Sequence, residues 1–255
     1  MSRRFVNSAA RLRYLEPAAL RIAPHPCPAC GPSILIRLAR SDLGVRCVRC
    51  GSSAITLSLI RVLRDRVSDL SDRSCYELST RGGVFAFLKR HAARVTGSEF
   101  IDGIEPGTIR DGIRCEDVQE LTFADSSFDI CTSTEVFEHV ANDIKAFSEI
   151  QRVLKPGGML LFTVPLFPAE NTVERARLEH GRIQHLKPPM FHDDHLRGLN
   201  KVLVFRDYGT DITHRLENAG FASAEIVRLP PELWWGHARP VLVAIKGGGV
   251  SATNA

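Results

Sequence analysis

After residue 74, the apolar and polar positions follow two periodicities that alternate along the chain. Short apolar runs of strand length are separated by stretches with the three-to-four-residue spacing of an amphipathic helix. This order is typical of a mostly parallel sheet with helices on both faces. The pattern predicts strands at 74–79, 94–100, 113–117, 128–134, 158–165, 222–229 and 240–246, and helices at 83–92, 139–154 and 210–219.

The last two predicted strands should run antiparallel to each other. Their connection contains Pro230, Pro231, Trp234 and Trp235, and it is too short for a crossover helix. The expected fold class is therefore α/β, with one reversed strand in an otherwise parallel sheet.

The first 73 residues follow a different pattern and predict a separate small lobe. Residues 33–38 have the character of a strand, 44–46 that of its antiparallel partner, and 54–70 have helical periodicity. We expect a basic segment and small lobe at 1–53, a linking helix at 54–73, and a main domain at 74–247. Within the main domain 166–200 should form a lid, and 248–255 should be a disordered tail.

Length and composition indicate a folded protein. The 255 residues are 44% apolar and 24% charged, which excludes disordered, collagenous and fibrous classes. No run approaches 18 uninterrupted apolar residues, and the first twenty residues contain no signal-peptide core. We expect a cytoplasmic protein without a membrane span; the Arg- and Ser-containing start also leaves an organelle transit peptide open.

Charge is distributed unevenly about Arg66. Residues 1–66 hold twelve arginines, no lysine and three acids, a net charge of +9, whereas the remainder carries −5. A basic segment of this kind either binds a polyanion, such as RNA, or docks on the acidic remainder of its own chain. Both interpretations stay open on the sequence alone.

Four of the seven cysteines form two C-x-x-C pairs, Cys27 with Cys30 and Cys47 with Cys50. This is the spacing of a zinc ribbon, in which four thiolates close a structural tetrahedral Zn²⁺ site. Two disulfides are the alternative. The three cysteines that remain are scattered in strand-like runs, which favours a reducing compartment and therefore zinc.

Acidic residues lie at the ends of four successive predicted strands. They are Glu77, Glu99, Asp117 and Glu135. In a parallel sheet the ligand site lies beyond the carboxyl ends of the strands. The acids therefore predict a binding site along that edge.

At this point the chain resembles the class I S-adenosylmethionine-dependent methyltransferases of the type 11 kind, across about residues 74–246. The resemblance is carried in order by residues 75–83, 97–99, 115–118 with 121–129, 135–140 and 154–158. It implies a Rossmann-like, seven-stranded, mostly parallel sheet whose last strand is antiparallel, together with methyl transfer from S-adenosylmethionine.

The resemblance also implies the roles of individual residues. Glu99 would accept both ribose hydroxyls, Asp117 would accept from the adenine amino group, and the Val118 amide would meet a ring nitrogen. The remaining cofactor-binding candidates are Glu77, Ser79, Arg81, Gly82, Gly83, Thr134 and Glu135.

The loop after the first strand departs from the family pattern. Where the family has three glycines, this chain has Ser79, Arg81 and Gly83. Glycine there allows positive φ and a close approach of backbone to ligand. Gly82 restores part of that freedom, while Ser79 or Arg81 could contact the carboxylate of the ligand.

Glu135, Glu138 and His139 are spaced to converge at the start of a predicted helix. The trio is similar to the divalent-metal motif of small-RNA 2′-O-methyltransferases and ubiquinone-pathway O-methyltransferases, which implies a possible Mg²⁺ site, with His192 or His195 as a further ligand. The alternative is that His139 lines the pocket or acts as a base, and His192 and His195 are further candidate bases.

Three functions remain open from the sequence. The first is methylation of a small-molecule or glycan-type acceptor under the lid, with the zinc lobe as a cap or dimer contact. The second is RNA methylation, in which the basic lobe holds RNA. The third is a non-catalytic binding protein built on a degenerate methyltransferase fold.

Overall fold

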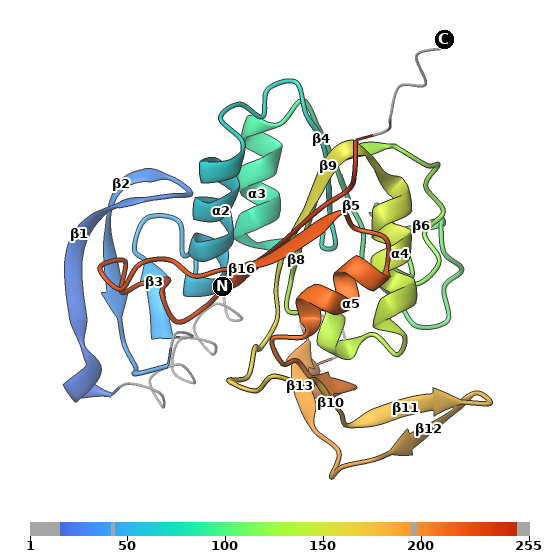
Figure 1. Ribbon diagram of the computed structural model, residues 1–255. Coiled ribbons are helices and arrows are strands. Elements are labelled where there is room, and N and C mark those ends of the chain that lie inside the picture. Colours follow the sequence, from blue (N-terminus) through green and yellow to red (C-terminus); the bar gives the residue numbers. More distant parts are fainter. Residues whose placement is uncertain (1–15, 42–43, 195–197, 249–255) are drawn as a thin grey trace.

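The structure, a computed structural model, describes residues 16–41, 44–194 and 198–248 (Figure 1). The N-terminal lobe begins with a short 3-10 turn, η2 (Pro17–Ala19), and an antiparallel sheet of β1 (Arg21–Cys27), β2 (Gly31–Arg37) and β3 (Val45–Cys47). Helix α2 (Ala54–Arg66) follows directly. Strand β1 is absent from the sequence prediction, because its two prolines and histidine hide the alternation of a strand.

The main sheet contains six strands. They are β4 (Ser74–Glu77), β5 (Arg94–Gly97), β8 (Phe128–Thr134), β9 (Leu154–Thr163), β16 (Ser223–Val227) and β17 (Val241–Ile245), in the spatial order β16-β17-β9-β8-β4-β5. Strand β17 is antiparallel to both of its neighbours, and the pairs β9-β8, β8-β4 and β4-β5 are parallel. The mostly parallel sheet with a reversed last strand is thus confirmed.

The expected seventh strand, 113–117, does not join the ladder. This region forms a small hairpin of β6 (Ile109–Arg110) and β7 (Ile113–Arg114), and it touches the sheet edge through a single bridge between Glu99 and Cys115. Only two hydrogen bonds carry that bridge, Glu99 N to Arg114 O at 3.0 Å and Glu116 N to Glu99 O at 3.1 Å. They still hold Glu99 beside the segment that carries Asp117.

Helices cover both faces of the sheet. Helices α2 and α3 (Gly82–His91) lie on one face, while α4 (Asp143–Val153) and α5 (Ile212–Asn218) lie on the other (Figure 1). Alternate strand residues supply two separate cores, as strand geometry requires. Cys75, Ile130 and Leu161 pack toward α2, and Tyr76, Cys131 and Phe162 toward α4.

The N-terminal lobe shares the first of these cores. Leu35 and Val45 of the lobe belong to the same cluster of buried residues as α2 and Trp235. Trp234 lies beneath two arginines of the lobe, with the guanidinium carbons of Arg21 and Arg37 at 4.7 and 5.2 Å from its ring centre. The lobe is therefore docked on the segment that connects β16 and β17.

The expected lid, 166–200, contains secondary structure that its sequence does not reveal. Three two-stranded ladders pair β10 (Val173–Glu174) with β15 (Arg206–Asp207), β11 (Ala176–Glu179) with β12 (Arg182–His185), and β13 (Phe191–Asp194) with β14 (Gly198–Leu203). A long connection must pair its backbone groups somewhere, and these ladders do so. No described helix is long and apolar enough to cross a membrane.

Candidate functional site

The predicted acidic row lies along the carboxyl ends of the strands. Glu77 ends β4, where Thr132 donates a hydrogen bond to its carboxylate, and the Ser98 amide donates to the Glu77 carbonyl at 3.3 Å. Glu99 lies two residues after the end of β5 and is buried like Glu77. Burial and the nearby charge of Glu99 raise the pKa of Glu77 to about 8. The two carboxyl groups are thus electrostatically linked at one edge of the sheet.

The loop after β4 holds the Glu99 carboxylate. Its Oε1 atom accepts from the Ser79 hydroxyl at 3.1 Å, and from both the amide and the hydroxyl of Thr80 at 2.8 Å. Thr80 is absent from the sequence prediction, because a hydroxyl residue beside a degenerate glycine motif carries no distinctive signal. Ser79, which stands where the family pattern has glycine, therefore helps the loop to orient the Glu99 carboxylate.

Two cavities meet beside this carboxylate, and both are lined by Leu78 and Val136. The smaller, of about 350 Å³, is lined by six of the predicted cofactor-binding residues: Ser79, Arg81, Gly82, Glu99, Thr134 and Glu135. The larger, of about 560 Å³, is lined by Asp117, Val118 and His139. Glu77 and Gly83 border neither cavity, although each is next in sequence to a lining residue, Leu78 and Gly82 respectively.

Gly82 and Gly83 are glycine for different reasons. Gly82 has φ +83, in the left-handed region, and an added Cβ there would meet nothing within 4 Å. Its conformation, not space, favours glycine. At Gly83 a Cβ would lie 2.6 Å from Thr56 Cγ2 and 2.8 Å from Ser52 Oγ. Gly83 therefore allows α3 to pack against the start of α2.

A carboxylate and two imidazoles form a compact cluster at the larger cavity. His139 Nε2 lies 3.2 Å from His192 Nδ1, and Glu138 Oε1 lies 3.7 Å from His139 Nε2 and 4.0 Å from His192 Nδ1. These three atoms are placed to hold one metal ion. We call Glu138, His139 and His192 the His-Glu cluster. His195, the other predicted base, lies outside the described residues.

Burial sets the chemistry of the His-Glu cluster. Glu138 is 1% exposed, and neither of its carboxylate oxygens has a hydrogen-bond partner among the described residues. Burial raises the pKa of Glu138 well above its ordinary value, and the charge of Glu135 adds to this. Burial lowers the pKa of His192, which favours its neutral imidazole. His139 Nδ1 contacts the Leu203 carbonyl at 2.8 Å, which turns Nε2 toward His192.

Glu135 does not join this cluster, contrary to the predicted convergence of Glu135, Glu138 and His139. Residues 137–139 form a 3-10 turn, η4 (Phe137–His139), and α4 begins only at Asp143, where the Asn142 side chain accepts from the Lys145 amide. Glu135 itself has φ +55, so helical spacing does not apply to it. Its Oε2 atom lies 3.1 Å from Arg239 Nη1. Arg239, 104 residues further on, had no sequence signal to mark it.

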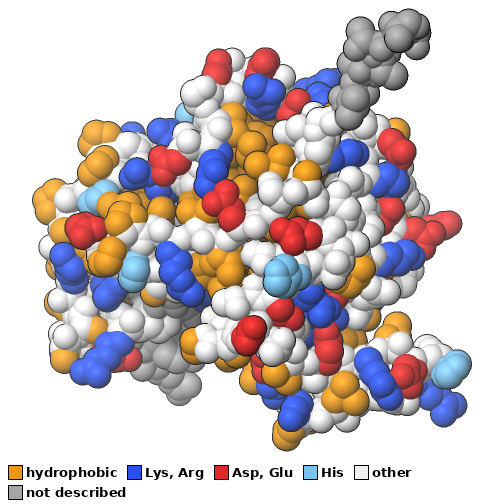
Figure 2. Space-filling model, viewed as in Figure 1, with side chains coloured by type: hydrophobic (Ala, Val, Ile, Leu, Met, Phe, Trp, Pro, Cys, Tyr) orange, Lys and Arg blue, Asp and Glu red, His pale blue; other side chains and the backbone are white. Residues whose placement is uncertain are grey.

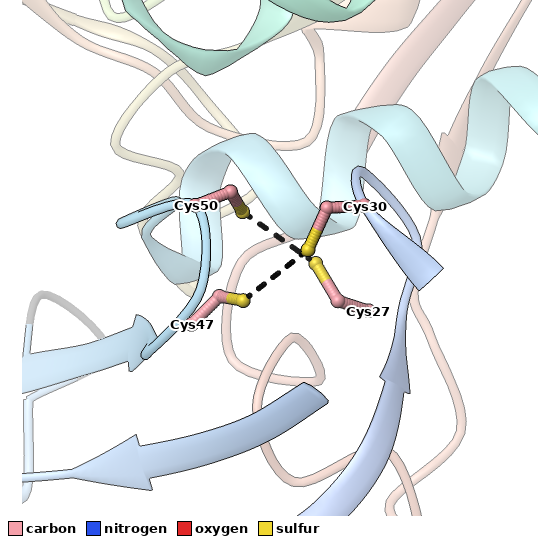
Figure 3. Close-up of side chains that lie close together, drawn as sticks. All are labelled: Cys27, Cys30, Cys47 and Cys50. Atoms are coloured by element: carbon pink, nitrogen blue, oxygen red, sulfur yellow. Dashed lines mark hydrogen bonds between the residues drawn. The ribbon is translucent and has the colours of Figure 1, made fainter. Parts of the chain in front are cut away.

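The four N-terminal cysteines converge on one point (Figure 3). The Sγ atoms of Cys27 and Cys50 are 3.8 Å apart, those of Cys30 and Cys47 are 3.7 Å apart, and all four lie within 4.8 Å of one another. Four sulfurs at about 2.3 Å from one zinc ion would be about 3.8 Å apart, so the donor set fits zinc. The structure holds all seven cysteines as free thiols, and no two of them are joined by a disulfide.

A family model described as a methyltransferase domain matches residues 79–162. That range contains the loop after β4, Glu99, Asp117 and the His-Glu turn at 137–139. The chain contains a class I methyltransferase domain. The α/β sheet with its reversed last strand agrees with this assignment.

Curated relatives match part of this chain. A probable S-adenosylmethionine-dependent methyltransferase of Mycolicibacterium smegmatis is 32% identical over 109 residues, which are 43% of this chain and 34% of that protein. A ubiquinone biosynthesis O-methyltransferase of Coxiella burnetii is 27% identical over 103 residues, 37% of this chain and 44% of that protein. This chain thus spans less than half the length of these relatives.

Solved structures of methyltransferases cover about three quarters of this chain. One is an S-adenosylmethionine dependent methyltransferase from Mesorhizobium loti, with 19% identity, a TM-score of 0.48, and coverage of 74% of this chain and 98% of that one. Another is the 1,6-didemethyltoxoflavin-N1-methyltransferase of Burkholderia thailandensis, with 17% identity, a TM-score of 0.48, and coverage of 76% and 79%.

Proposed function

We propose that this chain transfers a methyl group from S-adenosylmethionine to a small-molecule acceptor bound beneath the 166–200 segment. The observation that carries the proposal is the Glu99 carboxylate, which the loop after β4 fixes at the wall of a cavity. An ionised carboxylate suits a pair of ribose hydroxyls, because it accepts two charge-assisted hydrogen bonds.

The remaining cavity walls fit the rest of the donor. Asp117 and Val118 line the larger cavity, where a carboxylate and an apolar side chain suit an adenine ring and its amino group. Ser79, Arg81 and Gly82 line the smaller cavity and would face the amino-acid portion. The donor supplies an electrophilic methyl carbon. The chain then needs to align the acceptor with that carbon and exclude water, which is the entropic part of catalysis.

Acceptor binding is assigned to the larger cavity because His139 lines it. The Leu203 carbonyl orients His139, and Leu203 belongs to β14. The 166–200 segment and the strand that continues it therefore both cover the cavity and position its titratable group. His139 Nε2 can take the proton of an acceptor hydroxyl only while it binds no metal ion.

The position of the basic lobe favours a small molecule over RNA. Two lobe arginines, Arg21 and Arg37, stack on Trp234, and Arg66 pairs with Glu225 at 2.8 Å. These cations stabilise docking on the body of the chain and are not directed at a phosphate backbone. On the face shown in Figure 2, arginine and lysine side chains are interspersed with acidic and apolar ones.

We further propose that the His-Glu cluster holds a divalent metal ion. Ligand atoms at about 2.1 Å from one tetrahedral ion lie about 3.4 Å apart, close to the spacing of the three atoms here. The Leu203 carbonyl would take the other ring proton of His139, as metal-bound histidines usually require. Two imidazoles and one carboxylate suit Mn²⁺, Fe²⁺ or Zn²⁺ better than Mg²⁺, which prefers oxygen ligands.

A labelling experiment tests the methyl transfer. The full chain is incubated with S-adenosylmethionine that carries a tritiated methyl group. Separate reactions contain simple phenols, monosaccharides or total RNA as the acceptor. We expect label in at least one small-molecule fraction and none in RNA. Label confined to RNA would overturn the small-molecule proposal, and the absence of any transfer by protein that binds the donor would favour a non-catalytic role.

Metal binding is tested apart from activity. Mn²⁺ is titrated into zinc-loaded protein, and the free ion is followed by electron paramagnetic resonance. We expect one bound Mn²⁺ per chain, and a loss of affinity of at least about tenfold in His192→Ala. A matched control is His214→Ala, a histidine of α5 outside the cluster. Equal binding by both variants would contradict the assignment.

A further inference from the structure

One ion pair joins the smaller cavity to a distant segment of the chain. Glu135 lines this cavity, and its Oε2 atom lies 3.1 Å from Arg239 Nη1. Both side chains are mostly buried, since 24% of the Glu135 side chain and 12% of the Arg239 side chain are exposed. Arg239 itself lines neither cavity. It therefore acts on the smaller cavity only through the carboxylate that it holds.

The backbone of Glu135 is strained. Its φ of +55 lies in the left-handed region, which is unfavourable for a residue with a side chain. The Glu135 amide donates to the Thr163 carbonyl at 2.9 Å, so β9 and Arg239 hold the residue from two sides. Residues that their surroundings hold in such a conformation cluster at binding sites. A carboxylate accepts more than one hydrogen bond, so Glu135 can also accept from an ammonium group in the cavity.

Arg239 is fixed by its own segment, which connects β16 to β17 and reaches the N-terminal lobe before it returns to the sheet (Figure 1). The Arg239 amide donates to the Gly236 carbonyl at 3.1 Å, and the Ser58 hydroxyl of α2 donates to the same carbonyl at 3.0 Å. A Cβ on Gly236 would lie 2.8 Å from Ser58 Oγ, so segment and helix are in close contact. Strand β17 begins two residues after Arg239, at Val241.

The N-terminal lobe holds the same segment close to its cysteines. Trp235 is 1% exposed and belongs to the same cluster of buried residues as Cys27. The indole N–H of Trp235 donates to His25 Nε2 at 3.2 Å, and the Arg37 guanidinium donates to the Trp234 carbonyl. A single segment therefore connects the lobe to the wall of the smaller cavity.

We infer that Arg239 is a positioning residue of the donor site: it fixes the Glu135 carboxylate for the ammonium group of the donor's amino-acid portion, and the N-terminal lobe fixes Arg239. The inference rests on the proposed methyl transfer, because the donor is S-adenosylmethionine. An ammonium group that leaves water needs a charged partner in a fixed place. Because Arg239 does not line the cavity, it orients the carboxylate without occupying the place of the ligand.

Two ligands separate this role from the rest of the donor site. S-adenosylhomocysteine has the amino-acid portion, whereas 5′-methylthioadenosine has the nucleoside and the sulfur without it. Loss of Arg239 leaves the Glu135 carboxylate free to turn away from the cavity wall. Such a loss should weaken the first ligand and spare the second, whereas general damage to the fold would weaken both.

The experiment measures the Kd of both ligands by titration calorimetry on the zinc-loaded full chain. In Arg239→Met we expect S-adenosylhomocysteine to bind at least about tenfold more weakly, and 5′-methylthioadenosine to bind within about twofold of the wild type. Glu135→Gln should show the same pattern. In the double variant the loss for S-adenosylhomocysteine should be no larger than in Glu135→Gln alone, because Arg239 acts through Glu135.

Two further variants test the part of the lobe. Arg37→Met removes the hydrogen bond to the Trp234 carbonyl. It should keep its zinc and weaken S-adenosylhomocysteine by at least about twofold, with 5′-methylthioadenosine unchanged. The matched control is Arg66→Met, which removes the ion pair with Glu225 and lines neither cavity. It should leave both Kd values unchanged.

Two failures are distinguishable. If the wild type binds S-adenosylhomocysteine and Arg239→Met does not weaken it selectively, the inference is overturned and the donor site stands. The same holds if the losses in the double variant add up, or if Arg37→Met binds both ligands like the wild type. If the wild type does not bind S-adenosylhomocysteine at all, the proposed function fails, and this inference fails with it.

Discussion

Glu77 is the clearest case of a single side chain whose environment changes its chemistry. It is 1% exposed, it accepts a hydrogen bond from Thr132, and it lies beside the charge of Glu99. Burial and like charge both favour the neutral acid. The sequence predicted an acid at this strand end, but its protonation state depends on packing from β8, which only the fold supplies.

This environment predicts how stability depends on pH. The pKa of Glu77 rises from 4.5 to about 8 on folding, so the folded protein keeps a proton that the unfolded chain releases. The free energy of unfolding of the donor-free protein should therefore fall by about 5 kcal/mol as pH rises from 4.5 to 8, and then level off. Urea unfolding at a series of pH values measures it.

Glu77→Gln supplies the control for this prediction. Its neutral amide should remove most of that slope and leave the variant more stable than the wild type above pH 8. Parallel pH profiles for the two proteins would show that the Glu77 carboxyl is ionised in the folded state and would contradict the prediction.

The strands of the main sheet could be predicted closely from the sequence, whereas those of the 166–200 segment and of the strands paired with it could not. Strand β8 has its predicted bounds, 128–134, because its residues alternate between two apolar cores. Strands β10 and β15 have two residues each and pair positions 173–174 with 206–207. Their partners are distant in sequence and their side chains are mixed, so no periodicity marks them.

One buried arginine of β15, the strand that pairs with β10 of the 166–200 segment, is bonded to the turn that carries His139. Arg206 of β15 is 2% exposed and donates to the carbonyls of Phe137 at 3.1 Å, Val140 at 2.6 Å and Ala141 at 2.8 Å. It also contacts Asp143 at 3.6 Å and Glu174 at 3.2 Å. These contacts hold η4 in place ahead of α4, which begins at Asp143 and not at the predicted residue 139.

Arg206→Met should therefore destabilise the protein. The change leaves three carbonyls and part of two carboxylates without their donor, which costs about 3–5 kcal/mol when such a network is buried. Denaturant unfolding measures the loss. Arg177→Met is the matched control: its ion pair with Glu179 is largely exposed, so the expected change is below about 1 kcal/mol. Equal stabilities for the two variants would contradict this role of Arg206.

The N-terminal lobe and the methyltransferase domain behave as one body in the structure. Their shared core includes Leu35, Leu57 and Trp235, and the docking segment continues to Arg239, which contacts Glu135 at the smaller cavity. The cysteine spacing predicted the convergence of the four thiols from local residues alone. The docking could not be predicted, because it joins residues about two hundred positions apart.

Loss of zinc should therefore destabilise the chain beyond the N-terminal lobe as well. Cys47→Ser should lose the metal and lower the free energy of unfolding by more than about 3 kcal/mol, because binding energy of a structural zinc ion is folding energy. Both tryptophans of the chain, Trp234 and Trp235, lie at the docking contact, so their fluorescence should change with zinc removal. Cys131→Ala, a buried thiol outside the cluster, should keep the zinc. Full zinc content in Cys47→Ser would refute the site.

The central claim is that a fixed carboxylate at the strand edge holds the ribose of the methyl donor. Titration calorimetry with S-adenosylhomocysteine tests it most directly, on the wild type, on Glu99→Ala and on Glu120→Ala, an acid that lines neither cavity. We predict one site per chain, a loss of about a hundredfold or more in Glu99→Ala, since two charge-assisted hydrogen bonds are removed, and no change in Glu120→Ala. Unchanged affinity in folded Glu99→Ala, or no binding by the wild type, would contradict the account.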